Sequence, residues 1–202
     1  MPTTPTRPTR PALGARYDRR RAAVVEQAAL VFAEHGYAET SVAELADRLG
    51  LASGAIYHYF EGKQALLIAI CDELTVPLLE QASELLDSDG DPAATLRELL
   101  TVWVGHVTAH RDHLRVFTQV RHVVDHGEDW RGVRRARKDF ERLLDRALAR
   151  LDAQGALALD AGLARSALLG MVNHTAQWYR PRGRLSPEQI AEGYATAVVV
   201  AR

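Results

Sequence analysis

The sequence predicts an all-α protein of about nine helices. The apolar fraction is 47%, only 6% of residues are aromatic, and the apolar residues are mainly Ala and Leu, which are among the strongest helix formers. Apolar positions recur at helical spacing along most of the chain. Ser, Asp, Gly and Pro stand where such segments begin or end, as helix caps do. No segment shows a convincing strand pattern.

Three short helices are expected near the N-terminus. Apolar positions predict the first over about 17–34, and Gly36 ends it. Ser41 opens the second, and Glu44 three positions later completes a capping box. Ser53 is expected to cap a third helix that ends near residue 60.

Six longer helices are expected in the remainder. Asp91 followed by Pro92, and Ser186 followed by Pro187, are typical helix starts. Asp160 is expected to cap another helix. The expected ranges are about 63–86, 92–109, 112–124, 130–151, 161–179 and 187–200.

The segment TSVAELADRLGLASGAIYHYFEGKQALL, residues 40–67, has the pattern of two short helices joined by a tight turn. In a helix-turn-helix the second helix enters the major groove of DNA. Ile56 and Phe60, four positions apart, are expected to face inward, which leaves the side chains between them for phosphates and base edges. An alternative is an aromatic core cluster. The expected DNA-binding residues are Thr40, Ser41, Ser53, Gly54, Ala55, Tyr57, His58, Tyr59 and Lys63.

Arginine is concentrated at the N-terminus, although the net charge of the chain is −1. Residues 1–15 contain four prolines and are expected to form a flexible arm. A basic arm ahead of a helix-turn-helix can contact phosphates or the minor groove. A solvated, disordered tail is the alternative. The arginines are Arg7, Arg10, Arg16, Arg19, Arg20 and Arg21.

The segment from about Arg20 to Leu67 resembles the DNA-binding domain of the TetR family of bacterial transcriptional regulators. The matching positions are Phe32, Gly36, Thr40, Ser41, Ala46, Gly50, Ser53, Gly54, Tyr57, Tyr59, Phe60 and Lys63. The resemblance implies an all-helical homodimer whose remaining helices bind a small effector and the partner subunit. It also implies backbone or base contacts by Tyr57, His58 and Lys63.

The expected organisation is a flexible arm at 1–15, a helix-turn-helix DNA-binding domain at 16–62, and a ligand-binding and dimerisation domain at 63–202. The last two helices have apolar faces interspersed with small residues, which suit a four-helix interface between subunits. Packing against their own domain is the alternative. In the last helix the face comprises Ile190, Tyr194, Ala197, Val198 and Ala201.

The C-terminal segment MVNHTAQWYRPRGRLSPEQIAEGY resembles a TetR-family subgroup that includes repressors of fatty-acid and steroid side-chain catabolism. The shared residues are Asn173, Trp178, Tyr179, Pro181, Gly183, Leu185 and Ser186. This resemblance implies a shared architecture and makes an acyl-CoA thioester a candidate effector.

An apolar cavity is expected between the helices at about 92–124 and 161–179, with a few polar groups to orient a ligand. Core aromatics and surface polar residues are the alternative for each position. The expected ligand-binding residues are Trp103, His106, Val107, His110, Phe117, Arg121, His122, Met171, His174 and Trp178. Further candidates are Leu114, Gln119 and Asn173.

His106 and His110 are one helical turn apart and could share a metal ion. A third ligand is needed, and His113 lies near an expected helix end without an evident acidic partner. We therefore expect no metal and no cofactor.

The function expected from these features is a TetR-type DNA-binding regulator, a repressor released from a double-stranded DNA operator by a small, largely apolar effector. The alternative is a helical protein-binding scaffold without a ligand switch. The chain contains no GxSxG, P-loop, HExxH or Gly-rich dinucleotide turn, so an enzyme is not expected. Cys71 is the only cysteine, and neither a signal-peptide pattern nor a membrane-spanning apolar run is present. We expect a cytoplasmic homodimer that does not contact membranes.

Overall fold

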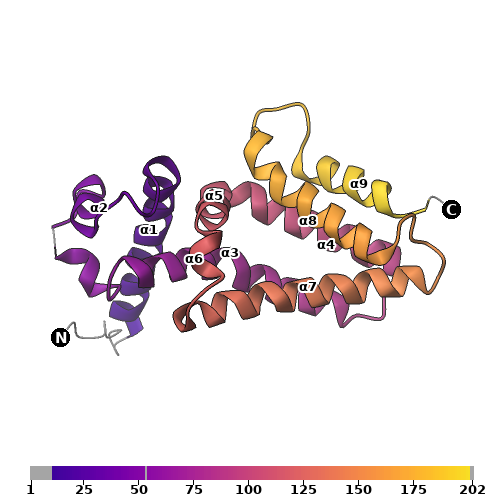
Figure 1. The fold of residues 1–202 in the computed structure, drawn as a ribbon, viewed down its shortest axis with the longest axis horizontal. Helices are drawn as coiled ribbons and strands as arrows, with labels where there is room; N and C mark the ends of the chain where they lie inside the picture. The colour runs from indigo at the N-terminus through magenta and orange to yellow at the C-terminus, as the bar shows by residue number, and fades with distance from the viewer. Residues whose placement is uncertain (1–10, 53, 201–202) are drawn as a thin grey trace.

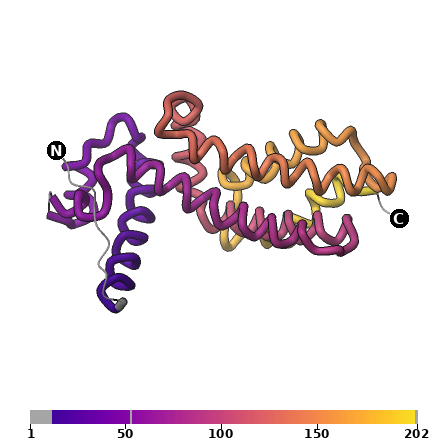
Figure 2. The backbone as a smooth tube through the Cα atoms, turned by 90° about the horizontal axis from the view of Figure 1, so that it is seen from below, coloured from indigo at the N-terminus to yellow at the C-terminus, as the bar shows by residue number. Residues whose placement is uncertain are grey.

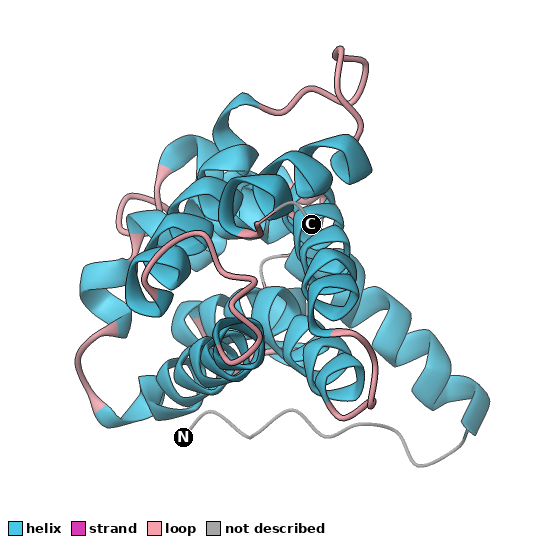
Figure 3. Ribbon diagram, turned by 90° about the vertical axis from the view of Figure 1, so that its right-hand side faces the viewer, coloured by secondary structure: helices cyan, strands magenta, loops and turns pink. Residues whose placement is uncertain are grey.

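The computed structural model describes residues 11–52 and 54–200, and in that part of the chain the regular secondary structure is helical. One isolated antiparallel bridge joins Leu157 and Val199. Helices and loops are the only elements drawn in Figure 3. The helices are α1 Pro11–His35, α2 Val42–Arg48, the 3₁₀ helix η1 Ala55–His58, α3 Lys63–Leu86, α4 Pro92–Ala109, α5 Arg111–Gln119, α6 Arg121–Val124, the 3₁₀ helix η2 Glu128–Trp130, α7 Arg131–Asp152, α8 Ala161–Trp178 and α9 Pro187–Val198.

The caps expected from the sequence start these helices. Ser41, Asp91, Asp160 and Ser186 each accept a hydrogen bond from the backbone N–H three residues later. A reciprocal capping box closes at Ser186, where the side chain of Gln189 accepts from the Ser186 backbone N–H at 2.9 Å. These local hydrogen bonds satisfy N–H groups that have no partner inside the helix, which is why the predicted starts agree with the structure.

Three expectations about the elements were wrong. Residues 11–15, predicted as part of a flexible arm, are the first residues of α1, and residues 1–10 lie outside the described part. Proline is tolerated at a first helical position because the missing N–H would have no helical partner there. The helix expected over 112–124 breaks at Val120 into α5 and α6. The expected α-helix at 53–60 is the shorter η1, and Ser53 lies outside the described residues.

The buried side chains form two clusters that α3 connects. One cluster joins α1, α2, η1 and the first part of α3 with residues of α5, α6 and the start of α7. The other lies between the rest of α3 and helices α4, α7, α8 and α9. In Figures 1 and 2, α1 and α2 form one end of the molecule, and α3 extends from them to lie beside α7. The domain boundary near residue 62 stays a prediction.

The face of α9 that we expected at a subunit interface packs largely within the chain. Ile190 and Val198 are buried in the second cluster, and α9 lies against α4. The Tyr194 hydroxyl forms a 2.8 Å hydrogen bond with the Thr175 hydroxyl of α8. An apolar stripe indicates burial but does not identify the partner. Ala197 is exposed, and Ala201 lies outside the described residues.

Cys71 is fully buried in α3, as expected for a cysteine inside an apolar run. Burial, with a smaller contribution from the nearby Asp72 carboxylate, raises the pKa of its thiol to about 12. The thiol is therefore protonated and acts as a small apolar side chain. Among the described helices, none combines the length and the apolar character needed to cross a bilayer.

Candidate nucleic-acid interface and effector cavity

The short helix η1 presents a polar surface to solvent. Its Ile56 is completely buried and anchors the helix in the first cluster, together with Phe60. Tyr57, 49% exposed, and His58, also exposed, project away from that core. The alternative of a sealed aromatic cluster is therefore wrong for Tyr57. We call the surface formed by Gly54, Ala55, Tyr57 and His58 the η1 surface.

Tyr59 belongs to a different face from Tyr57. It is half-buried against the first cluster, and its ring lies 5.1 Å, centroid to centroid, from the ring of Tyr17 in α1. The Tyr17 hydroxyl donates a 3.2 Å hydrogen bond to the backbone carbonyl of His58. These contacts hold the first turns of α1 beside η1.

This packing brings basic residues of α1 near the η1 surface. Arg21 places its guanidinium 4.6 Å from the centroid of the Phe60 ring, a cation–π geometry. Arg16, Arg19 and Arg20 lie within one turn of Tyr17 and are exposed. Exposed arginines beside a groove-sized surface are suited to phosphate contacts. Arg7 and Arg10, predicted for the same role, lie outside the described residues.

Lys63 was expected to bind a phosphate, and in this structure its ammonium has other partners. Its Nζ donates to the carbonyls of Tyr37, Ala38 and Thr40 at 2.8, 3.3 and 2.9 Å, and lies 4.4 Å from the centroid of the Tyr37 ring. An ammonium has three protons, and three carbonyls account for them. Lys63 therefore stabilises the turn between α1 and α2, and its expected phosphate contact stays a prediction.

The expected contact between the Thr40 side chain and DNA is corrected, because that side chain is only 1% exposed. Its hydroxyl donates to the Gly36 carbonyl at 2.8 Å and so stabilises the end of α1. The neighbouring Ser41 is exposed and caps α2. Of these two residues only Ser41 has a side chain that DNA could reach.

Replacing Lys63 with methionine is expected to destabilise the protein by about 1.5–3 kcal/mol, because the variant removes charge-assisted hydrogen bonds from three carbonyls. Chemical denaturation of the purified variant measures the change. Lys138→Met, at the other lysine of the chain, is the control and should leave the unfolding free energy within about 0.5 kcal/mol. Unchanged stability in Lys63→Met would contradict the structural role.

A cavity of about 390 Å³ lies between α3, α4, α5, α7 and α8. Among the residues predicted to bind a ligand, the structure places Trp103, His106, Val107, Phe117 and Arg121 in its wall. Of the three further candidates, Leu114 and Asn173 line it as well, whereas Gln119 is exposed and does not line it. The lining is mainly apolar along α3 and α4, where Thr75 and His106 are the polar residues, and further polar groups come from α5, α6, α7 and α8.

Five predicted ligand residues lie elsewhere. His122 and His174 are exposed on the surface, and Met171 packs against the second cluster. Trp178 is 43% exposed and lines a separate surface depression at the end of α8, with Arg111, Arg180 and Arg182. His110 does not line the cavity, and its Nδ1 lies 3.0 Å from the backbone carbonyl of His106. Helical periodicity could not separate these residues from true lining positions, since they lie in or beside helices that pack around the same core.

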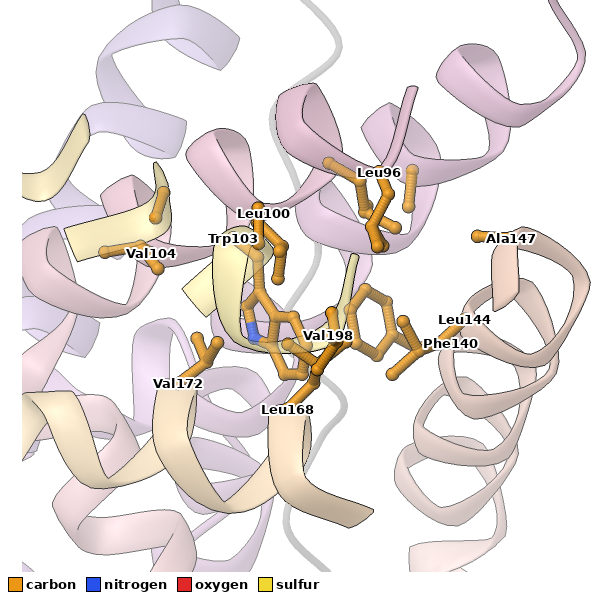
Figure 4. Close-up of a cluster of buried hydrophobic side chains, with 14 of the residues drawn as sticks. Leu96, Leu100, Trp103, Val104, Phe140, Leu144, Ala147, Leu168, Val172 and Val198 are labelled. Atoms are coloured by element: carbon orange, nitrogen blue, oxygen red, sulfur yellow. The ribbon is translucent and has the colours of Figure 1, made fainter. Parts of the chain in front are cut away.

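The sequence did not predict that α3 and α7 contribute lining residues to the cavity. Arg137, Phe140 and Glu141 of α7 line it, although the cavity was expected only between the helices at about 92–124 and 161–179. Phe140, the single aromatic residue of this highly charged helix, was the one signal in the sequence that pointed to a buried face of α7. The Phe140 ring lies edge-on to the Trp103 ring at 4.8 Å between centroids, and Figure 4 shows the two side chains meeting from α7 and α4. The missed residues of α3, α5 and α8 are Leu74, Thr75, Leu78, Thr118, Leu169 and Gly170.

Two arginines provide positive charge at the cavity. Arg137 donates to the Asp125 carboxylate at 3.0 Å and lies 3.9 Å from the Glu141 carboxylate. Arg121 lies 3.8 Å from the other oxygen of Asp125, and its side chain is 71% exposed. A carboxylate or phosphate group of a ligand could replace Asp125 as the partner of either guanidinium.

His106 is the polar residue that α4 contributes to the cavity wall. Its Nε2 lies 2.8 Å from the backbone carbonyl of Leu74. Burial lowers the pKa of His106 below its usual value, and the nearby His110 and His113 lower it further, against the Leu74 hydrogen bond. At neutral pH the imidazole is therefore uncharged, so Nε2–H donates to Leu74.

The fold and the site define a class: in the described residues, a helical protein with a helix-turn-helix surface at one end and a cavity between the helices of the other half. Comparison of the sequence with known protein families identifies the family of this chain. Residues 24–70 match the family described as bacterial regulatory proteins, tetR family, and residues 89–201 match the tetracyclin repressor-like C-terminal domain. The chain belongs to the TetR family and is a TetR-type transcriptional regulator.

Individual relatives agree with this assignment. The HTH-type transcriptional repressor KstR2 of Rhodococcus jostii is 27% identical over 183 residues, which cover 89% of each chain. The structure of the ketosteroid transcriptional regulator KstR2 of Mycobacterium tuberculosis has the same fold, with a TM-score of 0.81 at 21% identity over 90% of this chain and 96% of that one. AibR in complex with isovaleryl coenzyme A and operator DNA is 27% identical, with a TM-score of 0.73 over 87% of this chain and 96% of that one.

Proposed function

We propose that the protein is a transcriptional repressor that leaves its operator when a small, largely apolar effector binds. The observation that supports DNA binding most strongly is the η1 surface, where Tyr57 and His58 are exposed above a buried Ile56. Repression is proposed because KstR2 of Rhodococcus jostii is named as a transcriptional repressor. In this proposal residues 16–62 bind DNA and residues 63–202 form the regulatory unit.

The effector proposed is an acyl-CoA thioester. The cavity of about 390 Å³ lies near the lower end of the range of about 300–1,000 Å³ for small-molecule sites, so it suits an acyl group better than a whole coenzyme A. Arg121 and Arg137 are placed to meet phosphates of the nucleotide outside it. The complex of AibR with isovaleryl coenzyme A supports this class of ligand.

Two helices link the cavity with the DNA-binding end. Helix α3 begins at Lys63, beside the α1–α2 turn, and contributes Leu74 and Leu78 to the cavity. Helix α5 contributes Leu114 to the cavity, while its Val116 is buried in the first cluster against α1. A ligand that favours a different position of α3 or α5 would shift the DNA-binding end and lower operator affinity.

Dimerisation is proposed through the outward faces of α8 and α9. Leu163 of α8 is 57% exposed, and Gly193 and Ala197 of α9 present small exposed positions one turn apart. Small residues allow two helices to approach closely, and a two-fold axis would place the same faces against each other.

Replacing Ala197 with arginine is expected to weaken the dimer at least tenfold, because a long charged side chain would stand in the proposed contact. Sedimentation velocity over a concentration series measures the dissociation constant. Thr108→Arg, at a half-buried position of α4 outside the proposed contact, serves as the control. A dimer of unchanged affinity in Ala197→Arg would exclude α9 from the interface.

The proposed function is tested by selecting binding sites for the full-length protein from genomic DNA fragments and then titrating the complex with acyl-CoA thioesters of increasing chain length. We expect a specific operator, and release by a subset of chain lengths. Specific binding that no thioester or free acid relieves would reject the effector class. Absence of any specific DNA site would favour the protein-binding scaffold instead.

A further inference from the structure

His113 of α5 is a buried polar residue with an unsatisfied nitrogen. Its side chain is 1% exposed, and its Nε2 has no hydrogen-bond partner among the described residues. Leaving a polar nitrogen buried without a partner is unfavourable, and most buried polar groups in proteins avoid it. The exception makes His113 Nε2 a candidate ligand atom.

Two carboxylates from other helices face this nitrogen. The Glu73 carboxylate of α3 lies 3.4 Å from His113 Nε2, and the Glu26 carboxylate of α1 lies 3.7 Å from it. One ligand atom from each of the three residues falls within 4.8 Å of the others. We propose that Glu26, Glu73 and His113 bind a divalent transition-metal cation, with Zn²⁺ as the best-fitting ion.

The distances suit such a site. Ligand atoms at about 2.0–2.2 Å from a tetrahedral Zn²⁺ lie about 3.3–3.6 Å from one another. Both separations of the carboxylates from His113 Nε2 are close to this spacing. The Glu26 side chain is 56% exposed and that of Glu73 is 33% exposed, so either carboxylate can adjust by a rotamer change. Their exposed side leaves room for water as a fourth ligand.

One imidazole and two carboxylates together favour a transition-metal ion. Imidazole favours Zn²⁺ and similar transition metals, whereas Mg²⁺ and Ca²⁺ favour sites made of oxygen atoms alone. The neighbouring histidines have different roles, since His106 Nε2 and His110 Nδ1 each lie within hydrogen-bond distance of a backbone carbonyl.

The site joins the two halves of the protein. Glu26 belongs to α1 of the DNA-binding end, whereas Glu73 and His113 are adjacent in sequence to the cavity residues Leu74 and Leu114. A bound cation would tie α1 to α3 and α5. This inference rests on the three side chains and is independent of the proposed effector.

The test is Zn²⁺ binding to the full-length protein after removal of metal, measured by competition with a chromophoric chelator. We expect one tight site in the unsubstituted protein. Removing an outer-shell partner of a metal typically costs about 10–100-fold in affinity, so Glu73→Gln and Glu26→Gln, which remove ligands, should each cost at least tenfold. Glu80→Gln/Glu84→Gln, which removes two exposed carboxylates of α3, should leave the affinity unchanged.

Further measurements test the coordination and the metal selectivity of the proposed site. Co²⁺ should give the visible absorption of a four-coordinate site in the unsubstituted protein and not in Glu26→Gln/Glu73→Gln, and a tenfold excess of Mg²⁺ should not displace Zn²⁺. Zn²⁺ binding that is equal in the protein and in Glu26→Gln/Glu73→Gln would overturn the proposal, as would the absence of any tight site. His113→Gln could fail to fold, but the two glutamate variants alter exposed or half-exposed side chains, so they decide the question without it.

Discussion

Replacing Tyr57 and His58 together with alanine is expected to lower operator affinity by about 2–4 kcal/mol, a loss of about 30- to 1,000-fold. The reason is that these two side chains are the exposed polar groups of η1, while Ile56 holds the helix in the core. Fluorescence anisotropy with the selected operator at fixed salt measures the change. The stability of the double variant should stay within about 1 kcal/mol, because both side chains are at the surface.

The control for this variant is Gln81→Ala, at an exposed position of α3 far along the chain from η1. It should bind the operator as the unsubstituted protein does. If Tyr57→Ala/His58→Ala binds with unchanged affinity, η1 does not contact DNA. If the variant unfolds, the two side chains have a packing role that their exposure does not indicate.

Replacing Gly170 with leucine is expected to abolish the response to the effector while operator binding persists. Gly170 lines the cavity, and a Cβ atom added there would meet no atom within 4 Å. A leucine can therefore extend into the space proposed for the acyl group. Because leucine is a better helix former than glycine by about 0.8–1 kcal/mol, the folded state should not be weakened.

Gly132 provides the matched control for this change. Like Gly170, it is an exposed helical glycine with nothing within 4 Å of an added Cβ, but it lies at the start of α7 and does not line the cavity. Isothermal titration with the effector found by selection should show at least a tenfold loss for Gly170→Leu and none for Gly132→Leu. Equal binding by both variants would place the ligand elsewhere. Sedimentation of Gly170→Leu checks that its oligomeric state is unaltered.

The sequence predicted best the features that depend on local hydrogen bonds and periodicity. Ser41, Asp91, Asp160 and Ser186 start helices in the structure because each cap is completed within three residues. Ile56 and Phe60 are buried, as their spacing predicted, because residues four positions apart lie on the same face of a helical segment.

The features that the sequence did not predict depend on contacts between distant segments. Lys63 was expected to bind a phosphate, and its hydrogen bonds to three carbonyls were not foreseen because these lie in a turn more than 20 positions earlier. Ile190 and Val198 have the spacing of an interface, yet α4 covers them. His113 seemed to lack acidic neighbours because Glu26 and Glu73 lie on other helices. In each case the chain order hides which side chain reaches the group.

The most direct test of the account is hydroxyl-radical footprinting of the selected operator with the unsubstituted protein and with Tyr57→Ala/His58→Ala. A symmetric dimer that inserts η1 into successive major grooves should protect two equivalent patches about one helical turn, or about 34–36 Å, apart. The variant should lose both patches together at the same protein concentration. A single asymmetric patch, or protection by the variant equal to that of the unsubstituted protein, would contradict the account.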